Sequence, residues 1–272
     1  MTDWTGYLHV IGEKKGEKSI LQDSYYRGAF KITRPVYLDD SGQACLYVMN
    51  PGGGYVEGDS YRMEIQLEPG AEVLLTTQSS TKIYKTIEHP ILQSMEVILK
   101  EGSRLEYLPD PVIAFQHARF KQDMVVHMER NATLICTDIL TPGWAPDGSM
   151  FRYDLLQSRM KVFQEGKLVF FDHLKLEPDE QIQQLGSMEK YTHLGTMVII
   201  HEGIDEEVVD ELYQLASFAS ESRIGISLLM IPGITIRVQA HRTQDIEEWF
   251  GRCHEWIRER LLGSGKVFLR KY

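Results

Sequence analysis

Short stretches of β-type sequence recur along the first 200 residues, and they constrain the fold more than any other feature. Turn signals such as Asp40-Ser41-Gly42 and Pro142-Gly143 separate them. The clearest stretches are residues 43–49, 61–67, 72–77, 91–100, 104–108, 120–129, 133–140, 151–163, 167–176 and 190–201. Many short strands at this spacing predict a mainly β fold, as a sandwich, a barrel or a β-solenoid. No fixed-period repeat selects the solenoid.

The last quarter of the chain has a different pattern, which predicts two helices. Asp205 is a suitable N-cap for a helix that runs to about Ser220, and Thr243 for one that runs to about Leu262. Between them, residues 226–230 and 234–240 indicate a hairpin. No linker composition separates this tail from the rest, so we expect a single domain over 1–272, with a β body (1–200) and an α+β tail (201–272) packed on it.

The overall charge excludes some classes of partner. The 272 residues carry a formal net charge of −10, and the sequence pI is about 5.4. A general nucleic-acid binder or a protein that adheres to an anionic membrane needs a basic face. We therefore expect neither nucleic-acid nor membrane binding.

A glycine-rich loop interrupts the early strands. Gly52, Gly53 and Gly54 are consecutive, and Gly58-Asp59 follow immediately before an alternating strand. A phosphate-binding loop would need Gly-Lys-Ser/Thr leading into a helix, and neither is present here. The loop therefore predicts a sharp turn that places the Asp59 carboxylate at the start of a strand.

The motifs that would identify an enzyme or a tight metal site are missing from the sequence. The nine histidines are scattered without zinc-binding spacing, and the chain lacks a nucleophile elbow. The three cysteines are far apart and predict reduced thiols in a cytoplasmic protein. The start of the chain has no signal-peptide pattern, so we expect none.

Four carboxylates are the candidate functional groups. Asp59 follows the glycine loop, and Glu64 lies on the polar face of the next strand. Asp138 and Asp172 interrupt apolar strands, where a carboxylate is costly unless it is paired, hydrogen-bonded or metal-bound. These groups are either structural acceptors or parts of a polar interior through which a divalent cation moves.

Taken together, the segments resemble the urease accessory protein D family, also called H. The matching segments are Arg34-Pro35-Val36-Tyr37-Leu38, Gly52-Gly53-Gly54 with Gly58-Asp59, Pro69-Gly70-Ala71, Thr76-Thr77-Gln78-Ser79-Ser80-Thr81-Lys82-Ile83-Tyr84, Leu105-Glu106-Tyr107-Leu108-Pro109-Asp110-Pro111, Thr137-Asp138-Ile139-Leu140-Thr141-Pro142-Gly143, residues 233–237 and Tyr272. Trp4-Thr5-Gly6 and the Arg34 segment resemble the forms found in Gram-positive bacteria. Trp144 stands where many members carry arginine, so a role of that arginine cannot be transferred.

The resemblance implies a β-helical fold of stacked sheets with two C-terminal helices and no turnover of its own. Members act as scaffolds or metallochaperones in urease maturation. They bind the accessory protein F, which recruits the nickel-carrying GTPase G, and the assembly docks on urease apoprotein. Nickel passes transiently through a polar tunnel, and no cofactor is tightly bound. Asp59, Glu64, Asp138 and Asp172 are our candidates for groups along that path.

Two other hypotheses remain open on the sequence. One is a structural adaptor without a nickel path, which a dry and packed interior would favour. The other is a β-solenoid carbohydrate-active enzyme that uses two carboxylates, which would need an exposed cleft.

Overall fold

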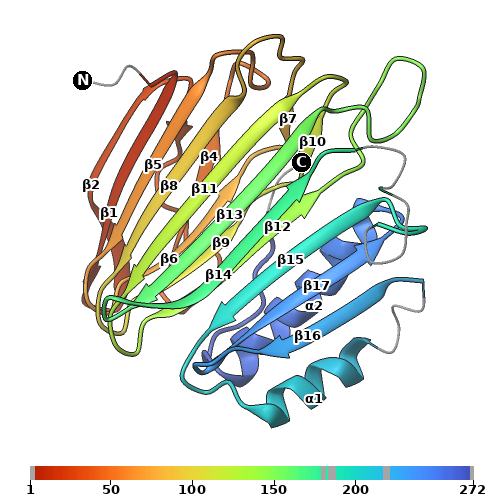
Figure 1. The fold of residues 1–272 in the computed structure, drawn as a ribbon. Coiled ribbons are helices and arrows are strands. Elements are labelled where there is room, and N and C mark those ends of the chain that lie inside the picture. Colours follow the sequence, from red (N-terminus) through yellow and green to blue (C-terminus); the bar gives the residue numbers. More distant parts are fainter. Residues whose placement is uncertain (1–3, 179–181, 183–187, 217–220, 270–272) are drawn as a thin grey trace.

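The computed structural model describes residues 4–178, 182, 188–216 and 221–269, which form two β-sheets and two α-helices (Figure 1). Tyr272 and the last four residues of the helix predicted to reach Ser220 lie outside the described residues. Within the described part, neither helix has the length and apolar character that crossing a bilayer requires.

The first sheet, called sheet A, contains seven strands of the described chain. They are β1 (Gly6–Lys15), β2 (Lys18–Gly28), β5 (Ser60–Leu67), β8 (Ile91–Leu99), β11 (Arg119–Met128), β13 (Leu155–Gln164) and β14 (Lys167–Leu176). Their order is β14-β13-β11-β8-β5-β1-β2. Neighbours from β1 to β13 are parallel, and β2 and β14 close the two edges as antiparallel strands.

The second sheet, called sheet B, lies behind sheet A in Figure 1 and contains ten strands of the described chain. They are β3 (Lys31–Ile32), β4 (Ala44–Met49), β6 (Glu72–Thr77), β7 (Thr81–Ile83), β9 (Arg104–Leu108), β10 (Val112–Ala114), β12 (Thr133–Leu140), β15 (His193–Ile200), β16 (Arg223–Leu228) and β17 (Gly233–Ala240). The main order is β16-β17-β15-β12-β9-β6-β4-β3, and β7 and β10 pair beside β12. Strands β4, β6, β9 and β12 are parallel, whereas β15, β17 and β16 pair antiparallel.

The chain winds between the sheets, so that β5, β8 and β11 of sheet A alternate with β6, β9 and β12 of sheet B. Successive coils stack in register: Val10, Ile65, Val97, Val126 and Val162 are neighbours across sheet A, and all five are buried. Inward β-branched residues on a pleated surface favour this stacking. The arrangement confirms the prediction of a mainly β, stacked-sheet fold of solenoid type.

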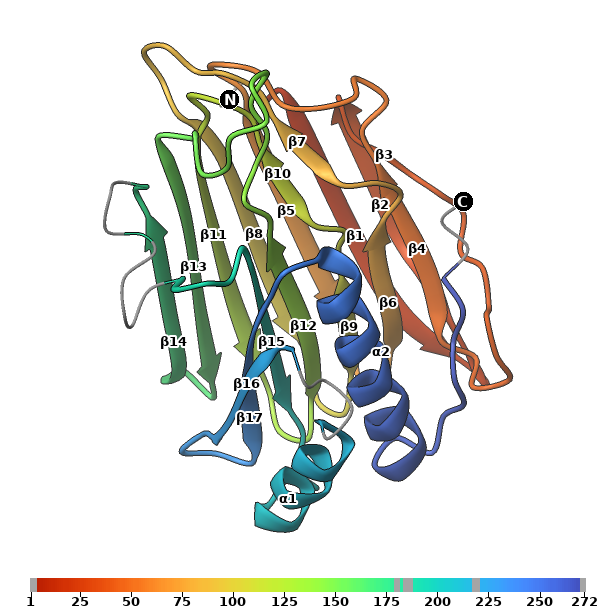
Figure 2. The same ribbon diagram turned by 90° about the vertical axis from the view of Figure 1, so that its right-hand side faces the viewer.

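Two apolar cores hold the layers together. The larger core fills the space between the sheets, and the smaller one lies between the outer face of sheet B and the helices α1 (Glu206–Leu215) and α2 (Thr243–Arg260). Figure 2 shows α2 lying against that sheet. Strand β12 is buried on both faces, with Leu134 in the larger core and Ile135 in the smaller. Burial on both faces explains its nearly continuous apolar sequence.

The tail is built into sheet B, because β17 pairs with β15. The predicted hairpin is confirmed as β16 and β17, and the cap of α1 is confirmed because Asp205 Oδ1 accepts from the Val208 N–H at 3.1 Å. The prediction of Thr243 as an N-cap was wrong. Arg242 is the cap residue, without a side-chain cap bond, and Asp245 supplies the favourable negative charge in the first turn.

Candidate functional site

A cavity of about 90 Å³ lies between the two sheets. It extends from Phe30 and Val48 at one side of the sandwich to Asp172 and Thr196 at the other. Its position follows from the solenoid winding, because inward side chains from successive coils share one interior. Polar groups interrupt the apolar lining where β11, β13 and β14 face β12 and β15.

Asp138 of β12 points into this cavity and is held by neutral partners. Its Oδ2 accepts hydrogen bonds from Gln122 Nε2 at 2.7 Å and from Ser158 Oγ at 2.8 Å, and Gln122 Nε2 also donates to Ser158 Oγ at 2.9 Å. Burial raises the pKa of Asp138 and outweighs the Ser158 hydrogen bond and the charge of Arg237, both of which lower it. The result is a half-buried carboxylate without an ion pair within the described residues.

Asp172 of β14 lies at the other side of the same polar region. It forms an ion pair with Arg237 of β17, and Arg237 Nη1 also donates to Thr196 Oγ1 at 2.9 Å. Asp172 raises the pKa of Asp138, as expected of two carboxylates that share one cavity. The structure therefore brings together two of the four predicted carboxylates.

The remaining wall of the cavity is mostly apolar and includes sulfur-containing side chains. Cys136 lines it beside Asp138, and its Sγ lies 3.9 Å from Met124 Sδ. Burial raises the pKa of the Cys136 thiol, and the nearby Asp138 carboxylate raises it further. The thiol is therefore protonated at neutral pH and is a poor metal ligand in this state.

Asp59 does not line the cavity. Its Oδ2 accepts from the Val56 N–H and from Tyr61 Oη, both at 2.8 Å, so it closes the turn that the glycine loop begins. Tyr61 stacks on Tyr55 with a ring-centroid separation of 3.7 Å, and Tyr55 is part of the cavity wall. Asp59 therefore supports that wall from behind.

Glu64 does not line the cavity either, because it projects from the outer face of sheet A. Tyr7 Oη donates to Glu64 at 2.5 Å, Arg62 Nε donates at 3.1 Å, and His9 lies 3.7 Å away. Hydrogen bonds from Tyr7 and Arg62 lower the pKa of Glu64 against the opposing effect of burial. It belongs to a surface cluster on the other side of the sheet from Asp138.

The glycine loop packs closely against Lys82 of β7 and against Tyr84, which follows that strand. The Tyr55 N–H donates to Lys82 O at 2.8 Å, and the Tyr84 N–H donates to Tyr55 O at 2.9 Å. A Cβ on Gly54 would lie 2.5 Å from the Tyr84 ring and 2.9 Å from Lys82 O. Gly53 and Gly58 have positive φ of 77° and 80°.

Of the other two residues of the sequence motif, Gly52 is bonded within its own loop, and Gln78 continues the pairing of β6 with β4. The Gly52 N–H donates to Asn50 Oδ1 at 3.0 Å, and the Gln78 N–H donates to Val48 O at 3.0 Å. The motif residues therefore shape the loops at the strand ends beside which the cavity lies. Their contacts are those of packing and turns.

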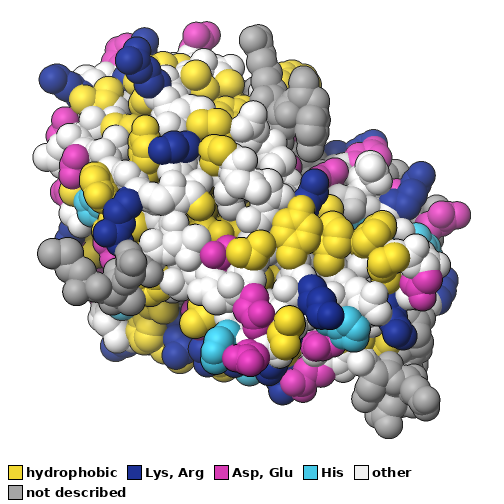
Figure 3. Space-filling view, turned by 90° about the horizontal axis from the view of Figure 1, so that it is seen from above, with side chains coloured by type: hydrophobic (Ala, Val, Ile, Leu, Met, Phe, Trp, Pro, Cys, Tyr) yellow, Lys and Arg dark blue, Asp and Glu magenta, His cyan; other side chains and the backbone are white. Residues whose placement is uncertain are grey.

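Trp144 extends a row of aromatic rings on this end of the molecule. The centroid separations are 4.9 Å for Tyr84–Phe115 and 5.2 Å for Phe115–Trp144. The Trp144 side chain is 51% exposed, and the loops of this end also expose Ile87 and Met150. Figure 3 shows hydrophobic side chains gathered on this face.

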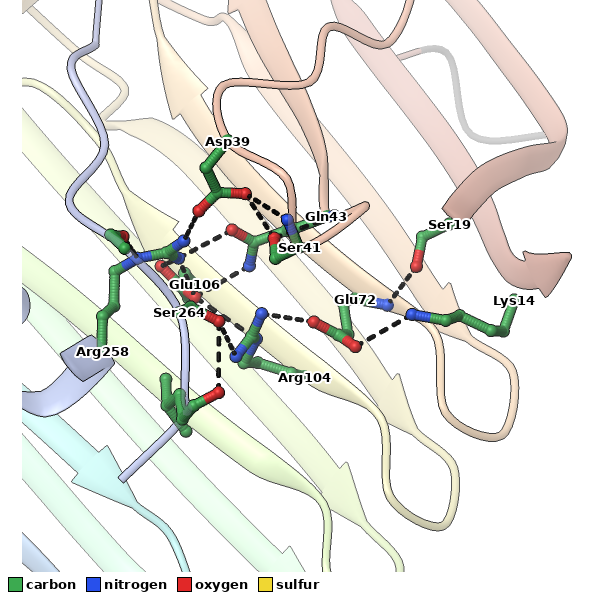
Figure 4. A network of polar contacts seen from close by, with 12 residues as sticks. Lys14, Ser19, Asp39, Ser41, Gln43, Glu72, Arg104, Glu106, Arg258 and Ser264 are labelled. Atoms are coloured by element: carbon green, nitrogen blue, oxygen red, sulfur yellow. Dashed lines mark hydrogen bonds and ion pairs between the residues drawn. The ribbon is translucent and has the colours of Figure 1, made fainter. Parts of the chain in front are cut away.

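A second polar cluster, which the sequence reasoning missed, lies between sheet B and α2 (Figure 4). Glu106 of β9 is fully buried, where it accepts from Arg258 Nη1 at 2.6 Å and Gln43 Nε2 at 2.8 Å and pairs with His254 Nε2 at 2.6 Å. Arg258 also reaches Asp39 Oδ2 at 2.5 Å. The network continues through Arg104, Glu72, Lys14 and Ser264.

The signal for this cluster was present in the sequence. Glu106 interrupts an apolar strand as Asp138 does, and His254 and Arg258 lie four residues apart on the apolar face of α2. Because Glu106 is compensated by cationic partners, it anchors the helix. Asp138, with neutral partners, is the better candidate for binding a cation.

The described part of the chain contains no group of three or more His, Cys, Asp or Glu side chains that could hold a metal ion. Asp138 and Asp172 provide two carboxylates, with hydroxyl and amide oxygens of Ser158, Thr196 and Gln122 nearby. The lining also includes Asp110 and the ion pair of Asp123 with Arg159. Such a sparse set of oxygens suits weak and exchanging contacts with a divalent cation better than a fixed coordination sphere.

Comparison with known proteins adds the family to this geometry. A family model described as UreD urease accessory protein matches residues 5–271. The chain belongs to the UreD family. The resemblance inferred from the sequence motifs is thereby confirmed over nearly the whole chain.

Curated proteins of the UreD family align with the chain from end to end. The protein of Lachnoclostridium phytofermentans is 47% identical over 274 residues, covering 100% of both chains. That of Bacillus sp. strain TB-90 is 44% identical over 269 residues, with 98% of this chain and 99% of its own covered. One from Staphylococcus aureus is 38% identical over 273 residues, with 99% and 98% covered. All three are named urease accessory protein UreD.

Proposed function

We propose that this protein is a cytoplasmic, non-catalytic urease maturation factor that passes Ni²⁺ toward the urease active site through the cavity between its sheets. It works in an assembly with the accessory proteins F and G and urease apoprotein. Membership of the UreD family supports the role in maturation. The observation that carries the nickel path is Asp138, a half-buried carboxylate that lines the interior cavity and is held by neutral partners.

A cation in the cavity would lower the free energy of the ionised Asp138 relative to the empty cavity. A half-buried carboxylate without a cationic partner is costly, and its raised pKa reflects that cost. A passing divalent cation offsets it. Because few ligands are available and they are already hydrogen-bonded, the ion is not trapped, which a conduit requires.

The size of the cavity argues against cleavage of a sugar chain between Asp138 and Asp172. Small-molecule sites occupy about 300–1,000 Å³, whereas the cavity that holds Asp138 and Asp172 measures about 90 Å³. That volume is sufficient for an ion with a few waters, because each water takes about 30 Å³ in the liquid.

The test is the nickel content of urease matured in cells that contain all accessory proteins and a variant of this chain. Asp138→Asn should lower the nickel per urease active site severalfold, because asparagine keeps the hydrogen-bond acceptor and removes the charge. Asp172→Asn should act in the same direction. Glu165→Gln, an exposed carboxylate paired with Arg130, is the control and should leave nickel content unchanged.

Two further sets of measurements distinguish the nickel path from a structural adaptor. Asp59→Ala and Glu64→Gln test whether the path also uses the other two predicted carboxylates, which lie outside the cavity. Co-purification with accessory protein F shows whether each variant still assembles. Normal nickel content with Asp138→Asn and Asp172→Asn, in assembled complexes, would favour the structural adaptor and refute the nickel path.

A further inference from the structure

At the edge strand β14 of sheet A, the two sheets that enclose the cavity differ in width. Sheet B continues past this edge with β15, β17 and β16, so its inner face beyond β15 has no strand of sheet A opposite it (Figure 1). Asp172 of β14 and Thr196 of β15 both line the cavity at this boundary. No backbone ladder joins β14 to sheet B in the described chain, so side chains close the wall here.

The side chain of Arg237, on β17, closes the gap between β14 and sheet B. It donates to Thr196 Oγ1 at 2.9 Å and forms an ion pair with Asp172, which links the two sheets. The side chain of Arg237 is 35% exposed and that of Asp172 is 25% exposed. Arg237 itself is not part of the cavity lining, so it covers two lining residues from the solvent side.

Arg237 also has space to move aside. Its antiparallel neighbour on β16 is Gly225, and a Cβ built on Gly225 would meet no atom within 4 Å. A residue with a side chain at this position would fill the surface beside the guanidinium. With glycine there, the sheet surface next to Arg237 is not covered by a side chain of the neighbouring strand.

The charge of Arg237 decides what its movement does. With Arg237 in place, the Asp172 carboxylate is compensated and an approaching cation meets a permanent positive charge. With Arg237 displaced, Asp172 joins Asp138 as a second free carboxylate, and the oxygens of Ser158 and Thr196 complete a set that suits a divalent cation.

We propose that the edge of β14 is a lateral mouth of the cavity and that Arg237 is its gate, which admits or releases a divalent cation when it leaves Asp172 and Thr196. The inference builds on the proposed nickel path, and it assigns Arg237 a role that a purely structural ion pair would not have.

A cysteine in the cavity wall allows opening of the mouth to be measured by chemical labelling. Cys136 lines the cavity, whereas Cys45 and Cys253 are buried elsewhere. Each cysteine of the full-length protein is therefore followed by mass spectrometry during reaction with a small neutral thiol reagent. Arg237→Gln should accelerate labelling of Cys136 about threefold, because it removes a partly exposed ion pair that opposes local opening, and should leave the rates at Cys45 and Cys253 unchanged.

Arg223→Gln is the matched control, because Arg223 lies on the neighbouring strand of the same sheet and pairs with Glu189 away from the cavity. Its labelling rates should equal those of the wild-type protein. Unchanged labelling of Cys136 in Arg237→Gln would overturn the proposal. Equal acceleration at all three cysteines would also overturn it, because that result reports general loosening of the fold.

Binding of Ni²⁺ alone, measured by calorimetry, gives the second readout. Arg237→Gln should bind Ni²⁺ roughly tenfold more tightly than Arg223→Gln, because a repelling charge is removed. Adding Asp138→Asn should abolish the gain, and persistence of the gain would overturn the proposal. If urease nickel content does not depend on Asp138 while these shifts appear, the gate stands and the delivery path fails; the converse result leaves the path and removes the gate.

Discussion

Two inward-facing carboxylates, the buried Glu106 and the half-buried Asp138, show how partners decide the role of a residue. Burial raises the pKa of both, but His254, Arg258 and Arg104 reverse the effect at Glu106 and bring its pKa to about 2. Glu106 is therefore charged and compensated, and it fixes α2 to sheet B. Asp138 keeps a raised pKa, so its ionised form is not compensated by a cationic partner as that of Glu106 is.

Glu106→Gln should destabilise the protein by about 3 kcal/mol, because it leaves the Arg258 guanidinium buried with one carboxylate fewer. Chemical denaturation measures this change in the free energy of unfolding. The control Glu165→Gln, at an exposed pair, should cost at most about 1 kcal/mol. Equal effects of the two substitutions would contradict the anchoring role of Glu106.

At the residue scale, the sequence indicates that carboxylates are the candidate groups, but it does not indicate which of the four line the cavity. Asp138 and Asp172 were predicted because a carboxylate inside an apolar strand is costly, and both line the cavity. Asp59 and Glu64 were predicted from their positions along one strand. The sequence could not show that one closes a turn and the other faces outward, because that depends on which strands lie opposite.

Among the elements, the glycine loop and β7 show how one residue sets the distance between two segments. Gly54 allows the loop backbone to approach Lys82 O and the Tyr84 ring, and the resulting bridge joins Tyr55 to Ile83. The loop is therefore a packing device at the end of the solenoid, beside the aromatic row that ends at Trp144.

Gly54→Ala should destabilise the protein by about 2 kcal/mol more than Gly53→Ala. At Gly53 a Cβ meets no atom within 4 Å, so alanine there costs only the strain of its positive φ, about 1 kcal/mol. Thermal unfolding of the two variants measures the difference. Equal midpoints would show that close packing at Gly54 is unimportant.

Most strands of the body were predictable from period-two patterns and turn residues, and residues 72–77, 104–108, 133–140 and 167–176 match the structure at both ends. Strands β1 and β2 were not predicted. Most of β2 is exposed at the edge of sheet A, and it lacks the alternation that burial of one face produces. The order of strands in each sheet depends on contacts between distant coils, which local patterns do not contain.

For the whole molecule, Glu106 and Asp138 give opposite dependences of stability on pH. The pKa of Glu106 falls from its ordinary value of 4.5 to about 2 on folding. Its contribution of about 3 kcal/mol is therefore present above pH 4.5 and is lost as the pH falls toward 2. The raised pKa of Asp138 has the reverse sign: ionisation of Asp138 costs stability at neutral pH, and that cost disappears on acidification.

Denaturation of the wild-type protein and two variants between pH 7 and pH 2 tests both signs. Glu106→Gln should flatten the loss of stability below pH 4.5. Asp138→Asn should raise stability at pH 7, because it removes a half-buried charge and keeps an acceptor for Gln122 and Ser158. A lower stability of Asp138→Asn at pH 7 would contradict the assignment of Asp138 as an uncompensated charge.

The anchoring of α2 also sets the order in which the molecule is completed during synthesis. The coils from β5 to β13 pair with near neighbours in the sequence, so they can form as the chain emerges. Arg258 is separated from Glu106 by 152 residues and from Asp39 by 219, so the outer face of sheet B stays uncovered until α2 has been synthesised. Until then Ile135 and Met197, which α2 helps to bury, remain accessible to water, so docking of α2 is a late step in the folding of this sheet.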